Sequence, residues 1–460
     1  MSGPAAGGGR PVHFIGIAGA GMTALAELFV RLGFRVSGCD TNLTAADDLR
    51  RLGIELFQDH DPAHVMGASK VIVTSAVRRD HPELVRAGEL GIPVMRRAEA
   101  LGRAVSGGQL VAIAGTHGKT TTTVMTTEAL KSAGLDPTGI AGGRVGAWNG
   151  NLSPGSDKLF VVEADEYDRS FHALSPTVAL VTNVEEDHLD IYPGGIDEIR
   201  DAFALFARDA KVIVLCGDDA GASTLPVPNS AEIIRYGTES PDVRLRASEI
   251  RVRNGGSSFT VSYDGKQLGE LILRVPGMHN VRNALAAVAT GIALGTTLDA
   301  MRAGLEAFTG VERRFQRLGE VAGVTIVDDY AHHPTEIAAT LEAARAAFPA
   351  QRIIAAFQPH LYTRTRDFHL EFANALGAAD VVYLCDLYPA REQPIAGVSA
   401  ALIADAMRAN GRAPEWEGPR AKLAAALVRG VRRGDVVLTL GAGDITRTGA
   451  ELRDLLTATK

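Results

Sequence analysis

The chain has 460 residues, with 47 Lys and Arg against 54 Asp and Glu, so its net charge is -7. Apolar residues make up 46% and charged residues 22%, which excludes a wholly disordered chain. The charge argues against nonspecific binding to nucleic acids or anionic membranes and favours a small-molecule partner, and no apolar run approaches the ~18 residues of a membrane span. Cys39, Cys216 and Cys385 are widely spaced, which predicts neither a disulfide framework nor a cysteine-based zinc site. We expect a cytoplasmic monomer or homodimer.

The first segment of the chain alternates apolar strands with helices. Strands are predicted over residues 12–17, 34–38 and 71–74, with a helix over 22–32. Such alternation indicates a parallel sheet covered by helices. A glycine-containing stretch at 102–108 is predicted to be the linker that ends this domain.

The same alternation restarts after this linker. Further strands are predicted over 110–114, 159–162, 178–182 and 212–215, and helices over 119–133 and 279–294. Short alternating segments over 243–275, with turns at Asn254-Gly255-Gly256 and Asp264-Gly265, predict an antiparallel insertion.

A third alternating set begins after a boundary near residues 309–312. Its strands are predicted over 324–327, 352–357, 381–385 and 436–440. Because about 150 residues is a typical domain, the chain is predicted to be an α/β protein of three domains, residues 1–105, 106–311 and 312–460.

A glycine-rich loop follows the first predicted strand. Gly19, Gly21 and Ala24 fit the pattern G-x-G-x-x-A, and Asp40 ends the next strand. Such glycines let backbone amides approach a pyrophosphate at a helix N-terminus, and Asp40 is a candidate acceptor for a sugar or base. A tight turn alone, a nicotinamide or flavin cofactor, and another diphosphate all remain possible at this point.

A second glycine loop, Gly115-Thr116-His117-Gly118-Lys119-Thr120-Thr121, also joins a predicted strand to a helix. It departs from the strict P-loop pattern because Ile113 stands where the first glycine is expected. Backbone amides and Lys119 are nevertheless suited to the phosphates of ATP, and the Thr120 hydroxyl to Mg²⁺.

Acidic residues and a histidine follow the next two predicted strands. Glu163-Ala164-Asp165-Glu166 comes directly after one strand, and His188 lies in the loop after the other. Open α/β sheets bind ligands at the carboxyl ends of their strands. Both segments are therefore candidates for the metal side of an ATP site, although acidic loops are often only solvated and single histidines often structural.

Together these motifs resemble the Mur ligase family. The resembling segments are Gly16 to Met22, Gly115 to Thr123, Glu163 to Phe171, Asn183 to Asp190, Gly277 to Ala284, Arg313 to Gln316, Asp328 to Glu336, Gln358 to Arg364, Asp386 to Val398 and Gly441 to Ile445. The resemblance implies an N-terminal Rossmann-like domain that binds a UDP-sugar and not NAD. It also implies a central P-loop-type ATPase with a mixed or parallel sheet and a C-terminal Rossmann-like domain that binds an amino acid.

The implied reaction is ATP-dependent amide formation between the lactyl carboxylate of UDP-N-acetylmuramate and L-alanine. It proceeds through an acyl phosphate, releases ADP and phosphate, uses Mg²⁺ and belongs to peptidoglycan synthesis. Because Arg314 and Asp329 would come from around or beyond the second boundary, the resemblance also implies domain closure during catalysis.

The family's site residues are carried over only onto matching positions. ATP would be bound by Gly115, Thr116, Gly118, Lys119, Thr120, Thr121, Asn280, Asn283, Arg314 and Asp329. One Mg²⁺ ion would be bound by Thr120 and Glu163, and a second by His188. Substrates would be bound by Gly16, Ala18, Gly19, Gly21, Met22, Asp40, Ser75, Tyr330, His332, His360 and Arg364. The candidate catalytic residues are Lys119, His188, Arg314 and His332.

Two positions depart from what relatives carry. Phe203 stands where sister ligases have a carbamylated, metal-bridging lysine, so no carbamate is expected. Leu361 follows His360 where alanine-adding members often have arginine, which leaves the amino-acid preference open. The rival interpretations are a family member that attaches a whole tripeptide, a dinucleotide-dependent oxidoreductase and a noncatalytic nucleotide sensor. A surface turn is the alternative for Arg364, and His333 is expected to have a mainly structural role at a helix start.

Overall fold

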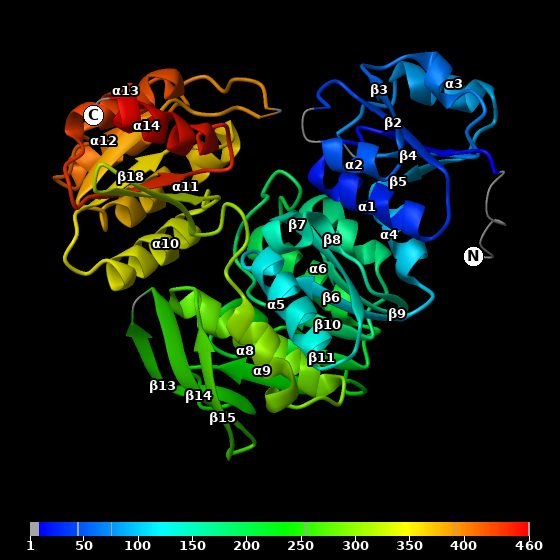
Figure 1. Ribbon diagram of the computed structural model, residues 1–460, viewed down its shortest axis with the longest axis horizontal. Coiled ribbons are helices and arrows are strands. Elements are labelled where there is room, and N and C mark those ends of the chain that lie inside the picture. Colours follow the sequence, from blue (N-terminus) through cyan, green and yellow to red (C-terminus); the bar gives the residue numbers. More distant parts are fainter. Residues whose placement is uncertain (1–8, 44–45, 75, 254, 391, 459–460) are drawn as a thin grey trace. The chain divides into compact units, whose positions relative to one another are not determined.

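The computed structural model describes residues 9–43, 46–74, 76–253, 255–390 and 392–458. The chain divides into two compact units, which consist of Met1–Arg246, Ser262–Gly269 and Asn283–Leu305, and of Ala247–Val261, Glu270–Arg282 and Glu306–Lys460. Three sheets follow one another along the chain (Figure 1). Among the described residues, no helix is long and apolar enough to cross a membrane.

The N-terminal sheet is parallel, with strand order β3-β2-β1-β4-β5. Its elements are β1 (Val12–Ile15), α1 (Ala20–Arg31), β2 (Val36–Asp40), α2 (Asp47–Arg51), β3 (Glu55–Gln58), the 3-10 helix η1 (Pro62–Val65), β4 (Lys70–Val73), α3 (Pro82–Glu89), β5 (Val94–Arg96) and α4 (Arg97–Val105). The linker prediction for residues 102–108 was wrong in its first half, because α4 continues to Val105. Gly102 is needed there for packing, since a Cβ would lie 2.1 Å from the Ala173 carbonyl oxygen.

The central sheet has ten strands in the order β15-β14-β13-β12-β11-β10-β6-β9-β7-β8. Its strands are β6 (Gln109–Ala114), β7 (Pro137–Val145), β8 (Gly150–Ser153), β9 (Ser156–Glu163), β10 (Val178–Val181), β11 (Val212–Cys216), β12 (Glu232–Gly237), β13 (Leu245–Arg253), β14 (Gly256–Tyr263) and β15 (Lys266–Leu273). The accompanying helices are α5 (Lys119–Ser132), η2 (Gly146–Trp148), η3 (Tyr167–Ala173), α6 (Gly195–Ala207), α7 (Ala220–Ser223), α8 (Met278–Ala293) and α9 (Leu298–Ala307).

The central sheet is mixed. Strands β6, β9, β10, β11 and β12 run parallel, which places their carboxyl ends at one edge. Only Asp264 and Gly265, both with positive φ, separate the neighbouring strands β14 and β15, so these two strands are antiparallel. This confirms the predicted hairpin at Asp264-Gly265. In the other predicted turn, Asn254 lies outside the described residues.

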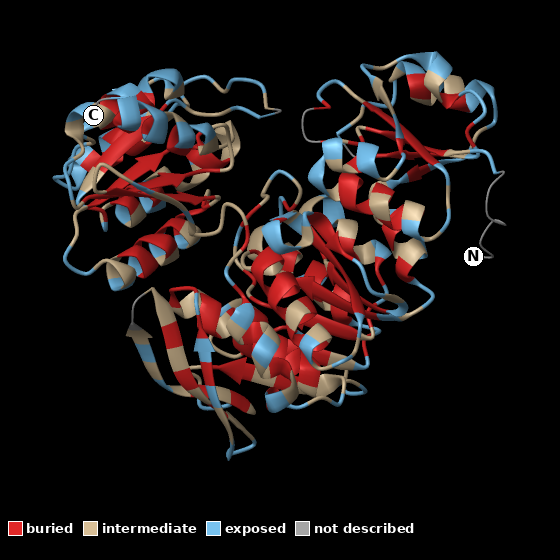
Figure 2. Cartoon of the chain, viewed as in Figure 1, coloured by how far each residue is buried: buried red, intermediate tan, exposed pale blue. Residues whose placement is uncertain are grey.

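The C-terminal sheet has the order β16-β17-β21-β18-β19-β20, in which only β16 pairs antiparallel. Its elements are β16 (Gln316–Val321), β17 (Val324–Asp329), α10 (Pro334–Ala347), β18 (Ile353–Phe357), α11 (Tyr362–Leu376), β19 (Val381–Cys385), α12 (Ala401–Ala409), β20 (Trp416–Gly418), η4 (Arg420–Lys422), α13 (Leu423–Gly430), β21 (Val436–Leu440) and α14 (Thr446–Ala458). Apolar residues of α10, α11 and α12 cover one face, and those of α13 and α14 cover the other. The sheet strands are largely buried (Figure 2), and the predicted α/β fold class is confirmed.

Candidate active site

The loop after β1 is folded back onto the end of β2. Gly16 has φ +79°, and its amide donates to the Cys39 carbonyl at 2.9 Å. The Asp40 carboxylate accepts the Ala18 amide at 3.0 Å, and Gly19 is the N-cap residue of α1. Asp40, which we expected to accept from a sugar or base, therefore also holds the loop in place.

The first turn of α1 is tightly packed. A Cβ at Gly21 would lie 3.0 Å from the Arg97 guanidinium, and Met22 is buried. The loop thus presents backbone at the start of a helix, where anions bind favourably. The predicted substrate residue Ser75 lies outside the described residues.

The second glycine loop requires glycine at two positions. Gly115 has φ +142°, and a Cβ there would lie 1.9 Å from the Thr182 hydroxyl. Gly118 has φ +82°, which disfavours other residues. The side chain of Asn183 accepts the His117 amide at 2.7 Å and donates to the His117 carbonyl at 3.1 Å. The end of β10 therefore holds the loop before any ligand arrives.

Lys119, the first residue of α5, has its ammonium group surrounded by oxygens. Its Nζ donates to the Gly115 carbonyl at 2.7 Å and the Thr116 carbonyl at 3.2 Å, and it lies 2.7 Å from a Glu166 carboxylate oxygen. Burial by itself would lower the pKa of Lys119, but the carboxylates of Glu166 and Asp165 raise it. The side chain is therefore a charged donor.

Thr120 and Glu163 provide paired oxygens of the kind that Mg²⁺ prefers. The Thr120 hydroxyl donates to Glu163 Oε1 at 3.0 Å, and the Gly142 amide contacts the other carboxylate oxygen. Two adjacent ligands on an octahedral Mg²⁺ ion lie about 3 Å apart, so this pair fits the ion. Burial raises the pKa of Glu163, which an added cation would counteract. Thr121 follows on α5 and is buried.

His188 faces the same acidic group from the loop after β10. Its Nε2 lies 3.8 Å from a Glu166 oxygen and 3.8 Å from an Asp187 oxygen, and its φ is +53°. Burial, only partly offset by Lys119, raises the pKa of Glu166 to about 7. The structure thus brings Lys119, Glu166 and His188 together.

Helix α8 carries the two predicted adenine-binding asparagines. Asn280 donates to the Pro276 carbonyl at 2.6 Å. Asn283, one turn later, lies so close to Gly118 that a Cβ on that glycine would be 2.9 Å from the Asn283 side-chain oxygen. Asn283 therefore lies directly beside the glycine loop.

In the second unit, Glu336 connects two predicted catalytic residues. Its carboxylate lies 3.3 Å from the Arg314 guanidinium and 3.1 Å from His332 Nδ1, and it accepts the His332 amide at 3.0 Å. The Tyr330 ring packs against both side chains, with the Arg314 guanidinium 5.1 Å from its centre. These residues form one compact polar group.

Asp329 anchors the chain around this group. Its two carboxylate oxygens accept the amides of Phe315 and Ala331, each at 2.7 Å. Burial raises the pKa of Asp329 to about 6, although Arg314 acts against this shift. The resemblance implies that a ribose hydroxyl of ATP binds Asp329. That hydroxyl would have to share carboxylate oxygens that already accept two backbone amides.

His360 and Arg364 occupy the start of α11. The His360 ring lies 5.9 Å from that of His332 and stacks on Tyr388. Leu361 caps the helix with φ +71°, an unusual conformation for leucine. Arg364 is only 5% exposed within the helix, so the alternative of a basic surface turn is wrong. His333 is the N-cap residue of α10, which confirms its predicted structural role at a helix start.

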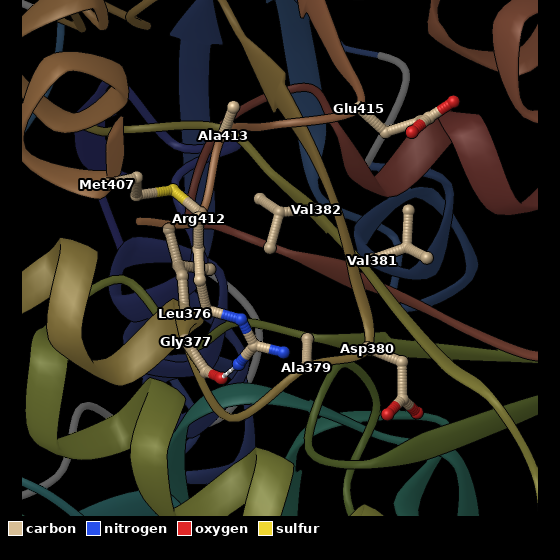
Figure 3. Close-up of a pocket in the computed structure, with 10 residues that line it drawn as sticks. All are labelled: Leu376, Gly377, Ala379, Asp380, Val381, Val382, Met407, Arg412, Ala413 and Glu415. Atoms are coloured by element: carbon tan, nitrogen blue, oxygen red, sulfur yellow. Dashed lines mark hydrogen bonds between the residues drawn. The ribbon is translucent and has the colours of Figure 1, made fainter. Parts of the chain in front are cut away.

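Two pockets lie in the second unit, and they differ in whether their location is one where α/β sheets bind ligands. The pocket in Figure 3 lies between the end of α11, β19 and the segment after α12, and none of the predicted site residues lines it. Another lies at the carboxyl ends of β19 and β20 and is lined by Tyr362, Asp386 and Gly418, among others. The second has the location in which open α/β sheets bind ligands.

Sequence reasoning missed two connecting carboxylates. Glu166 lay within an acidic run whose members looked equivalent, and Glu336 lay at the end of a resembling segment. Glu336 carried a usable signal, because it lies four residues after His332 across a helix start. Glu166 carried none, because its pairing with Lys119 depends on the turn into η3.

Comparison with known families finds three consecutive matches. Residues 11–109 match "Mur ligase family, catalytic domain", residues 113–291 match "Mur ligase middle domain", and residues 313–443 match "Mur ligase, glutamate ligase domain". These matches cover most of the chain.

Individual relatives match over nearly their whole lengths. UDP-N-acetylmuramate–L-alanine ligase of Geobacter sulfurreducens is 43% identical over 443 residues, which cover 95% of this chain and 96% of the relative. The crystal structure of UDP-N-acetylmuramate-alanine ligase from Thermotoga maritima is 31% identical, with a TM-score of 0.84 over 98% of this chain and 100% of that one. A murein peptide ligase from Psychrobacter arcticus is 25% identical, with a TM-score of 0.72 over 97% and 99% of the two chains.

Proposed function

The chain belongs to the Mur ligase family, and from this premise we propose that it joins L-alanine to the lactyl carboxylate of UDP-N-acetylmuramate at the expense of ATP. The products are the amide, ADP and phosphate, and the reaction serves peptidoglycan synthesis. Residues 1–105 bind the UDP-sugar, 106–311 bind ATP, and 312–460 bind the amino acid. The three free cysteines, all buried, support the reducing cytoplasm as its location.

The observation that carries the reaction class is the oxygen-lined Lys119 ammonium at the start of α5. A carboxylate is a poor electrophile, so its oxygen first attacks the γ-phosphate, and the amine of alanine then displaces phosphate from the acyl phosphate. Two anions must meet, which makes charge neutralisation the main catalytic requirement. Lys119 supplies a charge that is positioned in advance, and Arg314 supplies a second.

One Mg²⁺ ion bound by Thr120 and Glu163 and a second bound by His188 would add further neutralisation of phosphate charge. The side chains of the second unit have other tasks. His332 Nδ1 lies 2.9 Å from the Tyr330 carbonyl oxygen and 3.1 Å from the Glu336 carboxylate, and these contacts fix the ring close to His360. This arrangement supports a role for both histidines in positioning the incoming amine.

The choice of L-alanine rests on the relatives. The alanine-adding enzyme of Geobacter sulfurreducens is 43% identical, against 25% for the murein peptide ligase. The rival assignment as a dinucleotide-dependent oxidoreductase does not explain the phosphate-binding position of Lys119 or the metal-binding position of Glu163.

The decisive experiment measures phosphate release from ATP with UDP-N-acetylmuramate and each of L-alanine, L-serine, glycine and a tripeptide. We expect release to be fastest with L-alanine and to require both substrates. Release that is faster with the tripeptide would identify the rival ligase activity. ATP binding without any release would identify a nucleotide sensor.

A further inference from the structure

The N-terminal domain contains a group of metal-ligating side chains that the ligase reaction does not use. We call it the His/Cys cluster, and it consists of two groups that share Glu83: His13, Cys39 and Glu83, and His60, His81 and Glu83. His13 lies on β1 and Cys39 on β2, while His60 follows β3 and Glu83 begins α3. Four separate segments thus converge on one side of the sheet.

Three donor atoms of the cluster lie within 3.9 Å of one another, and His13 Nε2 approaches one of them. Cys39 Sγ lies 3.0 Å from Glu83 Oε2 and 3.2 Å from His60 Nδ1, and the last two atoms are 3.9 Å apart. His13 Nε2 lies 3.9 Å from the same Glu83 oxygen. Donors bound to a tetrahedral zinc ion at about 2.0–2.3 Å lie about 3.3–3.7 Å from one another. Small side-chain adjustments would therefore close the site around an ion.

His13 is an independent sign that a ligand is missing. It is fully buried, and its Nε2 has no hydrogen-bond partner. Its Nδ1 lies 3.0 Å from the Ser37 hydroxyl, and when that hydroxyl accepts the Nδ1 proton, Nε2 carries the lone pair that a metal ion requires. A buried nitrogen without a partner costs stability unless something binds it.

Glu83 is oriented by groups that leave one oxygen for the ion. Its Oε1 lies 2.8 Å from His64 Nδ1 and accepts the Asp61 amide at 3.1 Å. Its Oε2 points to Cys39, His60 and His13. Such outer contacts are the usual support of a metal-binding carboxylate.

We propose that His13 Nε2, Cys39 Sγ, His60 Nδ1 and Glu83 Oε2 bind one divalent transition-metal ion of zinc-like preference. A donor set of sulfur, nitrogen and carboxylate oxygen favours such an ion over Mg²⁺ or Ca²⁺. Cys39 loses its thiol proton to solvent when the ion binds. The widely spaced cysteines predicted no such site, because its donors come together only in the folded sheet.

The test uses cobalt as a spectroscopic substitute for zinc. The full-length chain is treated with chelator, desalted and titrated with Co²⁺ in the presence of excess Mg²⁺. We expect one equivalent of Co²⁺ to give a sulfur-to-cobalt charge-transfer band, which no oxygen site for ATP and Mg²⁺ can produce. Zn²⁺ should abolish the band and raise the melting temperature.

Cysteine variants locate the site. Cys39→Ala should lose the band and the Zn²⁺-induced stabilisation, whereas Cys385→Ala, which removes another buried free cysteine, should keep both. Glu83→Gln preserves size and should weaken Co²⁺ binding by at least about tenfold. Absence of a band from the unaltered chain, or its persistence in Cys39→Ala, would overturn the proposal. Neither result bears on ligase activity, so this test is independent of the proposed function.

Discussion

Replacement of Lys119 by alanine tests the central site most directly. The ammonium is held in place by two carbonyls and a carboxylate within 3.2 Å, and phosphate has to replace only the carboxylate. Loss of such a preorganised charge costs on the order of 3 kcal/mol in the transition state. We therefore expect turnover, measured as phosphate release, to fall by at least ~100-fold.

A matched control lies on the same helix. Lys131→Ala removes an equal charge from α5, where Lys131 contacts Ser153 and not the glycine loop, and it should leave turnover nearly unchanged. Circular dichroism should show a native fold for both variants. Near-normal turnover of a natively folded Lys119→Ala variant would refute the assigned role.

Four further outcomes are expected. His188→Ala should lower turnover and raise the Mg²⁺ concentration that turnover requires, and an unchanged magnesium titration would contradict this. The activity of the unaltered chain should not depend on added bicarbonate, and stimulation by bicarbonate would contradict this. Calorimetry should detect binding of UDP and not NAD, and Asp40→Ala should weaken UDP binding because Asp40 holds the first loop; NAD binding without a UDP signal would reverse that assignment. Gly118→Ala should lower the melting temperature more than Gly134→Ala, because both have positive φ but only the first would meet a neighbouring side chain; equal losses would disprove the packing argument. Since burial raises the pKa of Asp329 from 3.8 to about 6, its contribution to stability is complete below pH 3.8 and is lost as pH rises through 6. The melting temperature of the unaltered chain, relative to Asp329→Asn, should therefore fall between about pH 4 and pH 7, and a constant difference would argue against the shift.

The fold class could be predicted because buried parallel strands are short apolar runs that end at glycine loops. Both glycine loops followed such runs, β1 and β6, and this made them visible in the sequence. Strand β7 was not predicted, because three glycines interrupt its apolar run. In the structure Gly139 lies against α5 and Gly142 against Glu163, where a Cβ would be 2.6 Å from Thr127 and 2.7 Å from the carboxylate.

Side-chain partners were harder to predict than backbone positions. The acidic run after β9 placed several carboxylates near Lys119, but only the folded turn selects Glu166 as its partner. Gly102 presents the same difficulty, because the reason for a glycine inside α4 is the Ala173 carbonyl in a distant segment. Contacts between segments that are far apart in sequence leave no local pattern.

The Glu166 carboxylate contacts the Lys119 ammonium at the position that a phosphate group of ATP would take. When a triphosphate takes over the ammonium, Glu166 loses the cation that lowers its pKa, which is already about 7 because of burial. Phosphate and the Glu166 carboxylate therefore compete for the same ammonium, and a nucleotide that binds must displace this ion pair. A single buried glutamate thereby acts against occupancy of the loop.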